Sequence, residues 1–229
     1  MKRAFLAGLL VVSLPIFPIT FREDEVSPIQ LSLETLPSDG AKALVQWVEE
    51  ARGKLGDLLA NSFVLSTVSQ DGKPSSRVMT SKFINENGII VYGNANSQKF
   101  QQIQRNPSVS VTFYWPDMQR ALTMRGFAVK LSDKEAQAYF ATRPRHSQAA
   151  SHASSQSSPL QTREMLLNKH KQTLDRYEGQ KIPAPQAWAG YRLVPTEVEL
   201  WQAGAFTLHQ RISYQKNKKG DWQATLLQP

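Results

Sequence analysis

The sequence predicts a mainly β protein of the α+β class, a closed or nearly closed antiparallel barrel with helices packed outside it. Three observations predict this fold. Short segments that alternate apolar and polar residues recur along the chain. Turns between them carry hairpin signals such as Asp71-Gly72. Helical segments come as separate inserts and do not follow every strand, which argues against a parallel α/β sheet and favours a barrel.

The elements of the first half follow from local periodicity. Leu44, Val48 and Ala51 fall on one face of a helix, and Val111 and Phe113 lie on one face of a strand. Ser97 is suited to be an N-cap. We therefore expect helices over 39–53 and 97–105, and strands over 62–69, 76–83, 89–93, 108–115 and 121–131.

The second half contains the helical inserts and the last strands. Ser132 and Glu135 form a capping box that opens a helix ending near Thr142. Residues 146–158, HSQAASHASSQSS, are rich in Ser and Ala, and this composition predicts a low-complexity linker. We expect a charged helix over 163–177, and strands over 191–201, 211–215 and 222–227.

Composition limits the classes of function. The 229 residues include no cysteine, so disulfides, thiolate chemistry and zinc–cysteine sites are excluded. The net charge of +8 fits nucleic acid, an anionic membrane surface or small phosphorylated ligands. Basic residues are spread along the chain and no zinc finger or RNA-binding motif is present, so we do not expect a nucleic-acid partner.

The N-terminal region differs from the rest of the chain. Lys2 and Arg3 precede a largely apolar run over 4–19, as in a signal peptide or membrane anchor, although Pro15 and Pro18 interrupt it. The alternative is a poorly ordered extension. We expect residues 1–38 to form an apolar and extended N-terminal segment and residues 39–229 to form the folded domain. We expect a cytoplasmic protein, with export or membrane anchoring through residues 1–20 as the alternative.

Two groups of residues suggest phosphate binding by a strand and a helix start. Arg77 and Lys82 lie on one predicted strand, where odd and even positions face opposite sides, so they could serve two anions. Lys99 lies in the first turn of the helix that follows Ser97, where backbone N–H groups attract a phosphate. Surface charge and simple helix capping are the alternatives.

Two further groups add hydroxyl, guanidinium and aromatic side chains. Tyr139, Arg143 and Ser147 recur at a spacing of four, so a continuous helix would place them on one face as a cradle for a phosphate. Trp201 and His209 stand in WQAGAFTLHQR (201–211), a pattern that fits neither a helical stripe nor a strand. No Ser-His-Asp set and no His pair with metal-ligand spacing occurs, so we expect no metal site. Several anion sites with an aromatic platform suit a phosphorylated aromatic cofactor or substrate.

These motifs together resemble the pyridoxine (pyridoxamine) 5′-phosphate oxidase family. The resemblance is collinear from about Thr35 to Pro229 and implies an FMN-binding split β-barrel that is active as a homodimer, with FMN at the subunit interface. It rests on SRVMTSK (76–82), YGN (92–94), SQK (97–99), NPSVSVTFYW (106–115), YFATRPRHSQ (139–148), SSQSS (154–158), PAPQAWAG (183–190) and EVELWQAG…LHQR (197–211).

The resemblance also implies roles for individual residues. His209 and the position of Thr207 are the catalytic pair, and no metal is involved. The substrate is implied to contact Lys82, Tyr139, Arg143, Ser147 and His209. The cofactor FMN is implied to contact Arg77, Lys82, Tyr92, Gly93, Gln98, Lys99, Gln156, Ser157, Trp201 and Arg211.

The chain departs from the family pattern around the substrate ring. Thr207 stands where the family carries an Arg over the pyridine ring, and Thr offers neither a charge nor a planar group. Gln98 replaces an Arg, Ala121 replaces a Gln that contacts the flavin, and Ala189 replaces a Gly. The residues that bind the substrate phosphate are all retained, and those that bind FMN are mostly retained.

Three functions share this fold and cofactor. The first is FMN-dependent oxidation of pyridoxamine or pyridoxine 5′-phosphate to pyridoxal 5′-phosphate with oxygen as acceptor, at reduced efficiency because of Thr207. The second is a flavin oxidase for another substrate, similar to the phenazine-biosynthesis members. The third is a non-catalytic FMN or pyridoxal-phosphate binder. The expected partners are a phosphorylated pyridine substrate and a second copy of the chain, and a membrane only if residues 1–20 are an anchor.

Overall fold

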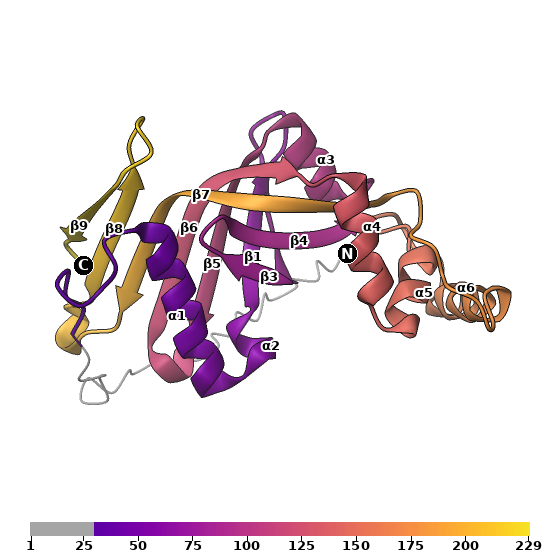
Figure 1. The fold of residues 1–229 in the computed structure, drawn as a ribbon, viewed down its shortest axis with the longest axis horizontal. Helices are drawn as coiled ribbons and strands as arrows, with labels where there is room; N and C mark the ends of the chain where they lie inside the picture. The colour runs from indigo at the N-terminus through magenta and orange to yellow at the C-terminus, as the bar shows by residue number, and fades with distance from the viewer. Residues whose placement is uncertain (1–29) are drawn as a thin grey trace, which may run out of the picture.

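The structure is a computed structural model that describes residues 30–229 (Figure 1). A curled antiparallel sheet forms its centre, one helix packs across the sheet, and a group of helices lies at one end. The apolar run over 4–19, with its expected role as a signal or anchor, lies outside the described residues. Within residues 30–229, no helix has both the length and the apolar character needed to cross a bilayer.

The first half of the described chain confirms the predicted elements with small shifts at their ends. The expected strand over 76–83 is the exception, because β2 ends at Thr80 and a separate short strand begins at Phe83. The bounds are α1 (Gly40–Leu55), α2 (Asp57–Ala60), β1 (Ser62–Val68), β2 (Pro74–Thr80), β3 (Phe83–Asn85), β4 (Gly88–Asn94), α3 (Gln98–Arg105) and β5 (Ser108–Trp115).

The second half begins with a short 3₁₀ turn and contains the three inserted helices. The capping box is present, since the Ser132 hydroxyl accepts from the Glu135 N–H and the Glu135 carboxylate accepts from the Ser132 N–H. The bounds are η1 (Pro116–Met118), β6 (Arg120–Lys130), α4 (Asp133–Thr142), α5 (Arg145–Ala153), α6 (Arg163–Arg176), β7 (Trp188–Gln202), η2 (Ala205–Thr207), β8 (Gln210–Lys216) and β9 (Trp222–Leu227).

The linker expected over 146–158 is wrong for most of its length, because Arg145–Ala153 is the helix α5. Composition alone missed a short amphipathic segment. Gln148, Ala149 and Ala153 fall on one face and are buried, and Ala149 packs with Phe140 in a small core of its own. Small residues allow this close approach of α4 and α5.

The nine-stranded sheet divides at the long strand β7. The strand order is β2-β1-β5-β6-β7-β4-β3, and β8 also pairs with β7 while β9 pairs with β8. β4 pairs with the first part of β7 (188–193) and β8 pairs with its last part (197–202). The sheet is therefore a half-barrel that splits at β7, and it does not close as a full barrel within the chain.

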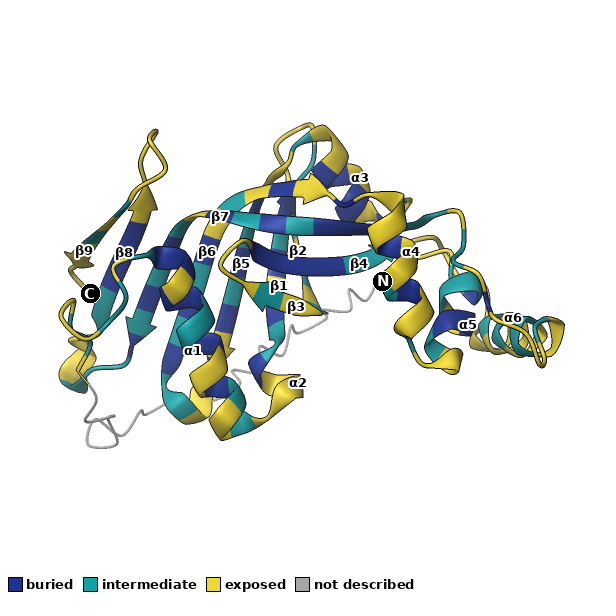
Figure 2. Cartoon of the chain, in the orientation of Figure 1, coloured by how far each residue is buried: buried dark blue, intermediate teal, exposed yellow. Residues whose placement is uncertain are grey.

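The main core lies between α1 and the concave side of the sheet (Figure 2). Trp47 of α1 and Trp115 of β5 are each only 1% exposed. The buried Arg120 joins the two layers, because its guanidinium lies 4.6 Å from the Trp47 ring and its Nη1 donates to Glu50 at 2.6 Å. Its Nε donates to Gln202 at 2.7 Å, so α1 is tied to the ends of β6 and β7.

Gly190 of β7 permits close packing against Tyr92. A Cβ at this position would lie 2.6 Å from a ring carbon of Tyr92 and 3.0 Å from Leu131. We expect Gly190→Ala to lower the free energy of unfolding by about 1–3 kcal/mol through overpacking. Urea unfolding measures this change. Gly53→Ala is the control, because nothing lies within 4 Å of a Cβ there and Ala in a helix stabilises by about 0.5–1 kcal/mol. Equal effects of the two substitutions would contradict the packing explanation.

Candidate functional site

A first cavity of about 330 Å³ lies where β2, the start of α3 and the loop after α5 meet. Its lining contains two cations and several hydroxyl and amide groups, and no carboxylate. The lining residues are Ser75, Ser76, Arg77, Val78, Gln98, Lys99, Gln156 and Ser157. The structure therefore brings together five of the residues that the resemblance assigned to FMN.

Arg77 lies on the edge strand β2, paired with the buried Leu65 of β1. Its Nη1 donates to the Thr67 hydroxyl at 2.7 Å and to the carbonyl oxygens of Leu65 and Ser75 at 3.1 and 2.9 Å. Burial lowers the pKa of Arg77. All these acceptors are neutral, and no carboxylate of residues 30–229 forms an ion pair with Arg77. The guanidinium is thus fixed in place while its charge stays available for an anion.

Lys99 is the second cation of this cavity and is 7% exposed. Its Nζ donates to Ser97 Oγ at 3.0 Å and to Gln156 Oε1 at 2.7 Å. Burial, together with the neighbouring charge of Arg77, lowers the pKa of Lys99 to about 8. Ser97 occupies the N-cap position, but its hydroxyl donates to the Asn94 carbonyl and does not cap α3. A buried and a half-buried cation, both held only by neutral groups, form a receptor for a doubly charged phosphate.

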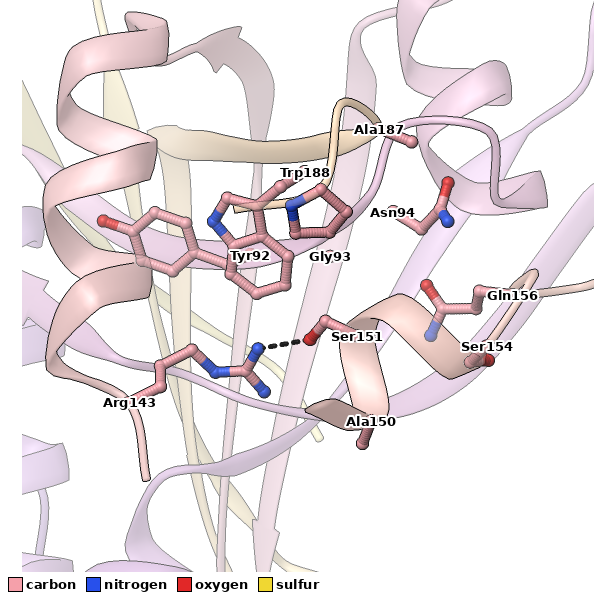
Figure 3. Close-up of a pocket in the computed structure, with 11 residues that line it drawn as sticks. Tyr92, Gly93, Asn94, Arg143, Ala150, Ser151, Ser154, Gln156, Ala187 and Trp188 are labelled. Atoms are coloured by element: carbon pink, nitrogen blue, oxygen red, sulfur yellow. Dashed lines mark hydrogen bonds between the residues drawn. The ribbon is translucent and has the colours of Figure 1, made fainter. Parts of the chain in front are cut away.

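A second cavity of about 210 Å³ lies beside the first, and the two share Gln156. It is bounded by the end of β4, the helix α5 and the segment that leads into β7 (Figure 3). Its lining residues are Tyr92, Gly93, Asn94, Arg143, Ala150, Ser151, Ser154, Gln156, Pro185, Ala187 and Trp188. A ligand in the first cavity can therefore extend towards this second, aromatic cavity.

Aromatic rings form a stack along one wall of the second cavity. Tyr92 lies parallel to Tyr139, with ring centroids 4.0 Å apart, and parallel to Trp188 at 6.0 Å. Phe83 meets the edge of the Tyr139 ring at 5.9 Å. Because Lys82 directly precedes Phe83, the stack brings the predicted substrate residues Lys82 and Tyr139 to the same region. Burial raises the pKa of Tyr139, so its hydroxyl stays protonated and can donate to a phosphate.

Arg143 lies at a break between two helices. The predicted single helical face for Tyr139, Arg143 and Ser147 is wrong, because α4 ends at Thr142 and Arg143 is extended. The cause is Pro144, which disfavours helical geometry in the residue before it. The guanidinium lies 4.6 Å from the Trp188 ring, and its Nη1 donates to the hydroxyl of Ser151 at 2.5 Å. Burial lowers the pKa of Arg143.

The prediction that Arg77 and Lys82 face opposite sides of one strand does not apply to Lys82. β2 ends at Thr80, and Lys82 lies in the link to β3, where its N–H donates to the Ile90 carbonyl at 3.0 Å. Its side chain is exposed. Lys82 therefore adjoins the aromatic stack through its chain neighbour Phe83, but it lines neither cavity.

A third group of candidate residues lies on β7 and β8, on the side opposite the core residues Leu200 and Ile212. Cross-strand pairing places Ala121 beside Trp201, and Trp201 beside Arg211. The Trp201 and His209 rings are 4.8 Å apart. Arg211 Nε donates to Glu199 at 2.9 Å, and its Nη1 donates to the Gln228 carbonyl at 3.0 Å. The structure thus brings Trp201, His209 and Arg211 together.

The loop that carries Thr207 and His209 has an unusual backbone. Phe206 and Thr207 have φ angles of 54° and 61°, a region that is unfavourable for a β-branched residue. The Thr207 hydroxyl donates to the Phe206 carbonyl at 2.6 Å, and the side chain is exposed. The N–H of Gly204 donates to His209 Nδ1 at 3.2 Å, so in the neutral ring the proton is on Nε2.

The third group is remote from the two cavities within one chain. Trp188 begins β7 and Trp201 lies near its end, and thirteen residues of extended strand span about 40 Å. In Figure 1 the β8–β9 hairpin and the helices α4–α6 lie at opposite ends of the molecule. One chain therefore does not assemble all the residues that the resemblance assigned to one site.

Sequence reasoning missed several residues that shape the site. Thr67 and Gln102 support Arg77, since the Thr67 hydroxyl donates to Gln102, whose amide donates to Ser75. Ser151 and Trp188 hold Arg143. A weak signal existed for Ser151, which follows Ser147 by four residues and so shares its helical face. Nothing local marked Thr67, because its partners come from other strands and from α3.

The curled half-barrel divides at β7. Its first cavity contains two cations and no carboxylate. These features define the split β-barrel class, in which FMN-binding proteins occur. Residues 54–176 match the family model for pyridoxamine 5′-phosphate oxidase. Residues 188–229 match the C-terminal dimerisation region of pyridoxine 5′-phosphate oxidase. The chain belongs to the pyridoxine/pyridoxamine 5′-phosphate oxidase family.

Individual relatives agree with this assignment. Pyridoxine/pyridoxamine 5′-phosphate oxidase of Rubrobacter xylanophilus is 38% identical over 199 residues, which cover 85% of this chain and 91% of that protein. The enzyme of Leptospira biflexa is also 38% identical, covering 87% and 93%. The crystal structure of PhzG from Burkholderia lata in complex with tetrahydrophenazine-1-carboxylic acid is 30% identical, with a TM-score of 0.82 and coverage of 89% of this chain and 99% of that one.

Proposed function

We propose that this protein oxidises pyridoxamine or pyridoxine 5′-phosphate to pyridoxal 5′-phosphate, with FMN as cofactor and oxygen as acceptor. The observation that carries the proposal is the pair of adjoining cavities. One holds Arg77 and Lys99 without a carboxylate, and the other holds Arg143 beside stacked aromatic rings. A phosphate-bearing flavin fits the first, and a phosphorylated pyridine fits the second.

Each group of residues has a distinct task in this proposal. The redox chemistry would be supplied by FMN, as acceptor of a hydride from the 4′ carbon of the substrate and as donor of the electrons to oxygen. Arg77, Lys99 and Ser157 hold its phosphate. Arg143 and Tyr139 hold the substrate phosphate and so orient the 4′ carbon. His209 presents the N–H of Nε2, since its Nδ1 is occupied by the Gly204 N–H.

The proposed active site contains residues from two subunits. Trp201, His209 and Arg211 lie within 188–229, the region that matches a dimerisation region, and this region indicates that the chain forms a homodimer. We infer that these residues complete the cavities of the partner subunit, because they are remote from the cavities of their own chain. The hydrogen bond that Arg211 makes with Glu199 holds it on the side of the sheet away from the core, where a second copy can approach.

Mixing two inactive variants tests this proposal. Arg77→Ala and Arg211→Ala each damage both sites of a homodimer. In a mixed dimer one site carries both substitutions and the other carries neither. If subunits exchange at random, half of the dimers are mixed, and about a quarter of wild-type activity returns for a two-fold symmetric dimer. The assay is formation of pyridoxal 5′-phosphate from pyridoxamine 5′-phosphate. No recovery after verified subunit exchange would contradict the shared site.

A second candidate function is oxidation of another aromatic substrate. Thr207 leaves the ring-facing loop without the family Arg, and PhzG, whose crystal structure contains a tricyclic acid, has a similar fold over 89% of this chain. The retained Arg143 favours a phosphorylated substrate. Comparing the rates with pyridoxamine 5′-phosphate and with a dihydrophenazine carboxylic acid distinguishes the two functions.

The third candidate function is that of a non-catalytic binder of FMN or pyridoxal phosphate, which would retain both ligands without turnover.

For location, we propose a cytoplasmic protein whose folded domain is 39–229, with export or anchoring through residues 1–20 as the alternative. Fractionation of cells that express the full chain tests the location.

The affinity for FMN is expected to fall as the pH rises above about 8. The pKa of Lys99 is lowered to about 8, so above this pH the free protein loses the proton that attracts the phosphate. The dissociation constant should then rise by up to about tenfold per pH unit. Flavin fluorescence between pH 6.5 and 9.5 measures it. Lys99→Arg should give a flat profile in the alkaline range, and an unchanged profile would show that Lys99 is not the titrating group.

A further inference from the structure

A hydroxyl outside the predicted substrate set contacts the Arg143 guanidinium. Ser151 of α5 accepts a hydrogen bond from Arg143 Nη1 at 2.5 Å, and its own O–H donates to the Ser147 carbonyl at 3.0 Å (Figure 3). The hydroxyl proton of Ser151 is thus donated within the helix. An oxygen lone pair is left to accept the hydrogen bond from Arg143. The helix α5 fixes the direction of this hydrogen bond.

Other contacts of Arg143 leave its orientation open. Its backbone is extended at the end of α4, and its guanidinium lies over the faces of Trp188 and Phe140 at 4.6 and 5.8 Å. Ring faces attract a cation but do not select which N–H points where. Within residues 30–229 no carboxylate forms an ion pair with Arg143. The Ser151 hydroxyl is therefore the directional contact that fixes rotation of the guanidinium.

We propose that Ser151 is a positioning residue that holds Arg143 ready to receive the substrate phosphate. The proposal rests on the function proposed above, in which Arg143 binds that phosphate. A guanidinium has five N–H donors, so the bond to Ser151 leaves a free edge for two phosphate oxygens. Fixing the side chain before binding removes part of the entropy that substrate binding would otherwise lose. Ser151 lines the same cavity as Arg143, so the held guanidinium borders the space that the ligand enters.

Ser151→Ala is expected to raise KM for pyridoxamine 5′-phosphate about 3- to 10-fold, the loss that one mobile long side chain causes on binding. The kcat should change much less than KM, because the bound substrate phosphate itself holds Arg143 once the complex has formed, and Tyr139 still contacts that phosphate. Inorganic phosphate, as a competitive inhibitor, should bind more weakly by a similar factor. Ser151→Thr keeps the hydroxyl and should restore KM.

Thr173→Ala is the matched control for loss of a helical hydroxyl. The Thr173 hydroxyl donates to the Lys169 carbonyl at 2.9 Å on α6, the same four-residue relation as Ser151 with Ser147. Thr173 does not line either cavity. A change that reflects only helix stability should appear in both variants and in their melting temperatures, whereas the rise in KM should appear in Ser151→Ala alone.

Arg143→Ala separates failure of this inference from failure of the proposed function. If Arg143→Ala raises KM and weakens phosphate inhibition while Ser151→Ala changes neither, the positioning role of Ser151 is wrong. It is also wrong if Ser151→Ala lowers kcat and melting temperature together with no rise in KM. If Arg143→Ala itself leaves KM and phosphate inhibition unchanged, the assignment of Arg143 to the substrate phosphate fails first.

Discussion

Thr207→Arg is expected to raise kcat/KM for pyridoxamine 5′-phosphate by about 30- to 1000-fold. A charged contact in a desolvated site is worth about 2–4 kcal/mol, which corresponds to this range. Thr207 is exposed on the loop that ends at His209, and its hydroxyl is used in a bond to its neighbour Phe206. An Arg there would reach beyond the loop, and it would also remove the strain of a β-branched side chain at a φ of 61°. Steady-state oxidation assays measure the gain.

Two controls separate charge from backbone strain. Thr207→Asn relieves strain without adding charge, because Asn tolerates this backbone region, and it should change kcat/KM little. Thr207→Lys adds a charge without the planar group and should give an intermediate gain. If Thr207→Arg gives no gain, the missing Arg is not the deficiency, and Ala121 and Gln98 become the next positions to restore.

Arg77→Ala is expected to weaken FMN binding by about 30- to several thousand-fold, because truncating one member of a buried charge pair costs about 2–5 kcal/mol. Arg77 is held by three neutral acceptors and has no carboxylate partner in the described chain, so a phosphate is the charge that it can balance. Quenching of flavin fluorescence measures the affinity.

The controls for Arg77 test charge, geometry and folding in turn. Arg77→Lys keeps the charge but loses the fork of donors, so we expect a loss between those of wild type and Arg77→Ala. Arg105→Ala removes an exposed cation from the last turn of the same helix that carries Lys99 and should leave affinity unchanged. Riboflavin, which lacks the phosphate, should bind wild type and Arg77→Ala equally. A loss of riboflavin binding as large as that of FMN would contradict a phosphate role.

Most of the helices and strands could be predicted, because local sequence patterns indicate them. The alternation of Val109, Val111 and Phe113 gave β5, and the Ser132–Glu135 box gave the start of α4, with both confirmed by the structure. The helix α5 was not predicted, since its buried face consists of Gln148 and two alanines, which have no clear apolar period. The split β-barrel was confirmed, but the position of the split was not predicted, because local patterns do not show that β7 pairs with different strands along its length.

The candidate site could be predicted only in part for a related reason. Arg77 and Lys99 occur in recognisable sequence motifs, and the structure places both residues in one cavity. The supporting contacts of Thr67 and Ser151 join segments that are distant in sequence or separated by a helix break, so no local pattern contained them. The separation of Trp201 from the cavities of its own chain follows from the path of β7. The completion of a site by a second subunit depends on how two subunits assemble. Spacing along the chain reveals neither.

One measurement tests the proposed function most directly. The purified protein is reconstituted with FMN, oxygen is removed, pyridoxamine 5′-phosphate is added, and the visible absorbance of the flavin is followed. We predict that the absorbance bleaches and that it recovers when oxygen is admitted, with formation of pyridoxal 5′-phosphate. If bound FMN stays oxidised in the presence of saturating substrate, the protein is not an oxidase for pyridoxamine 5′-phosphate, and the proposed function is wrong.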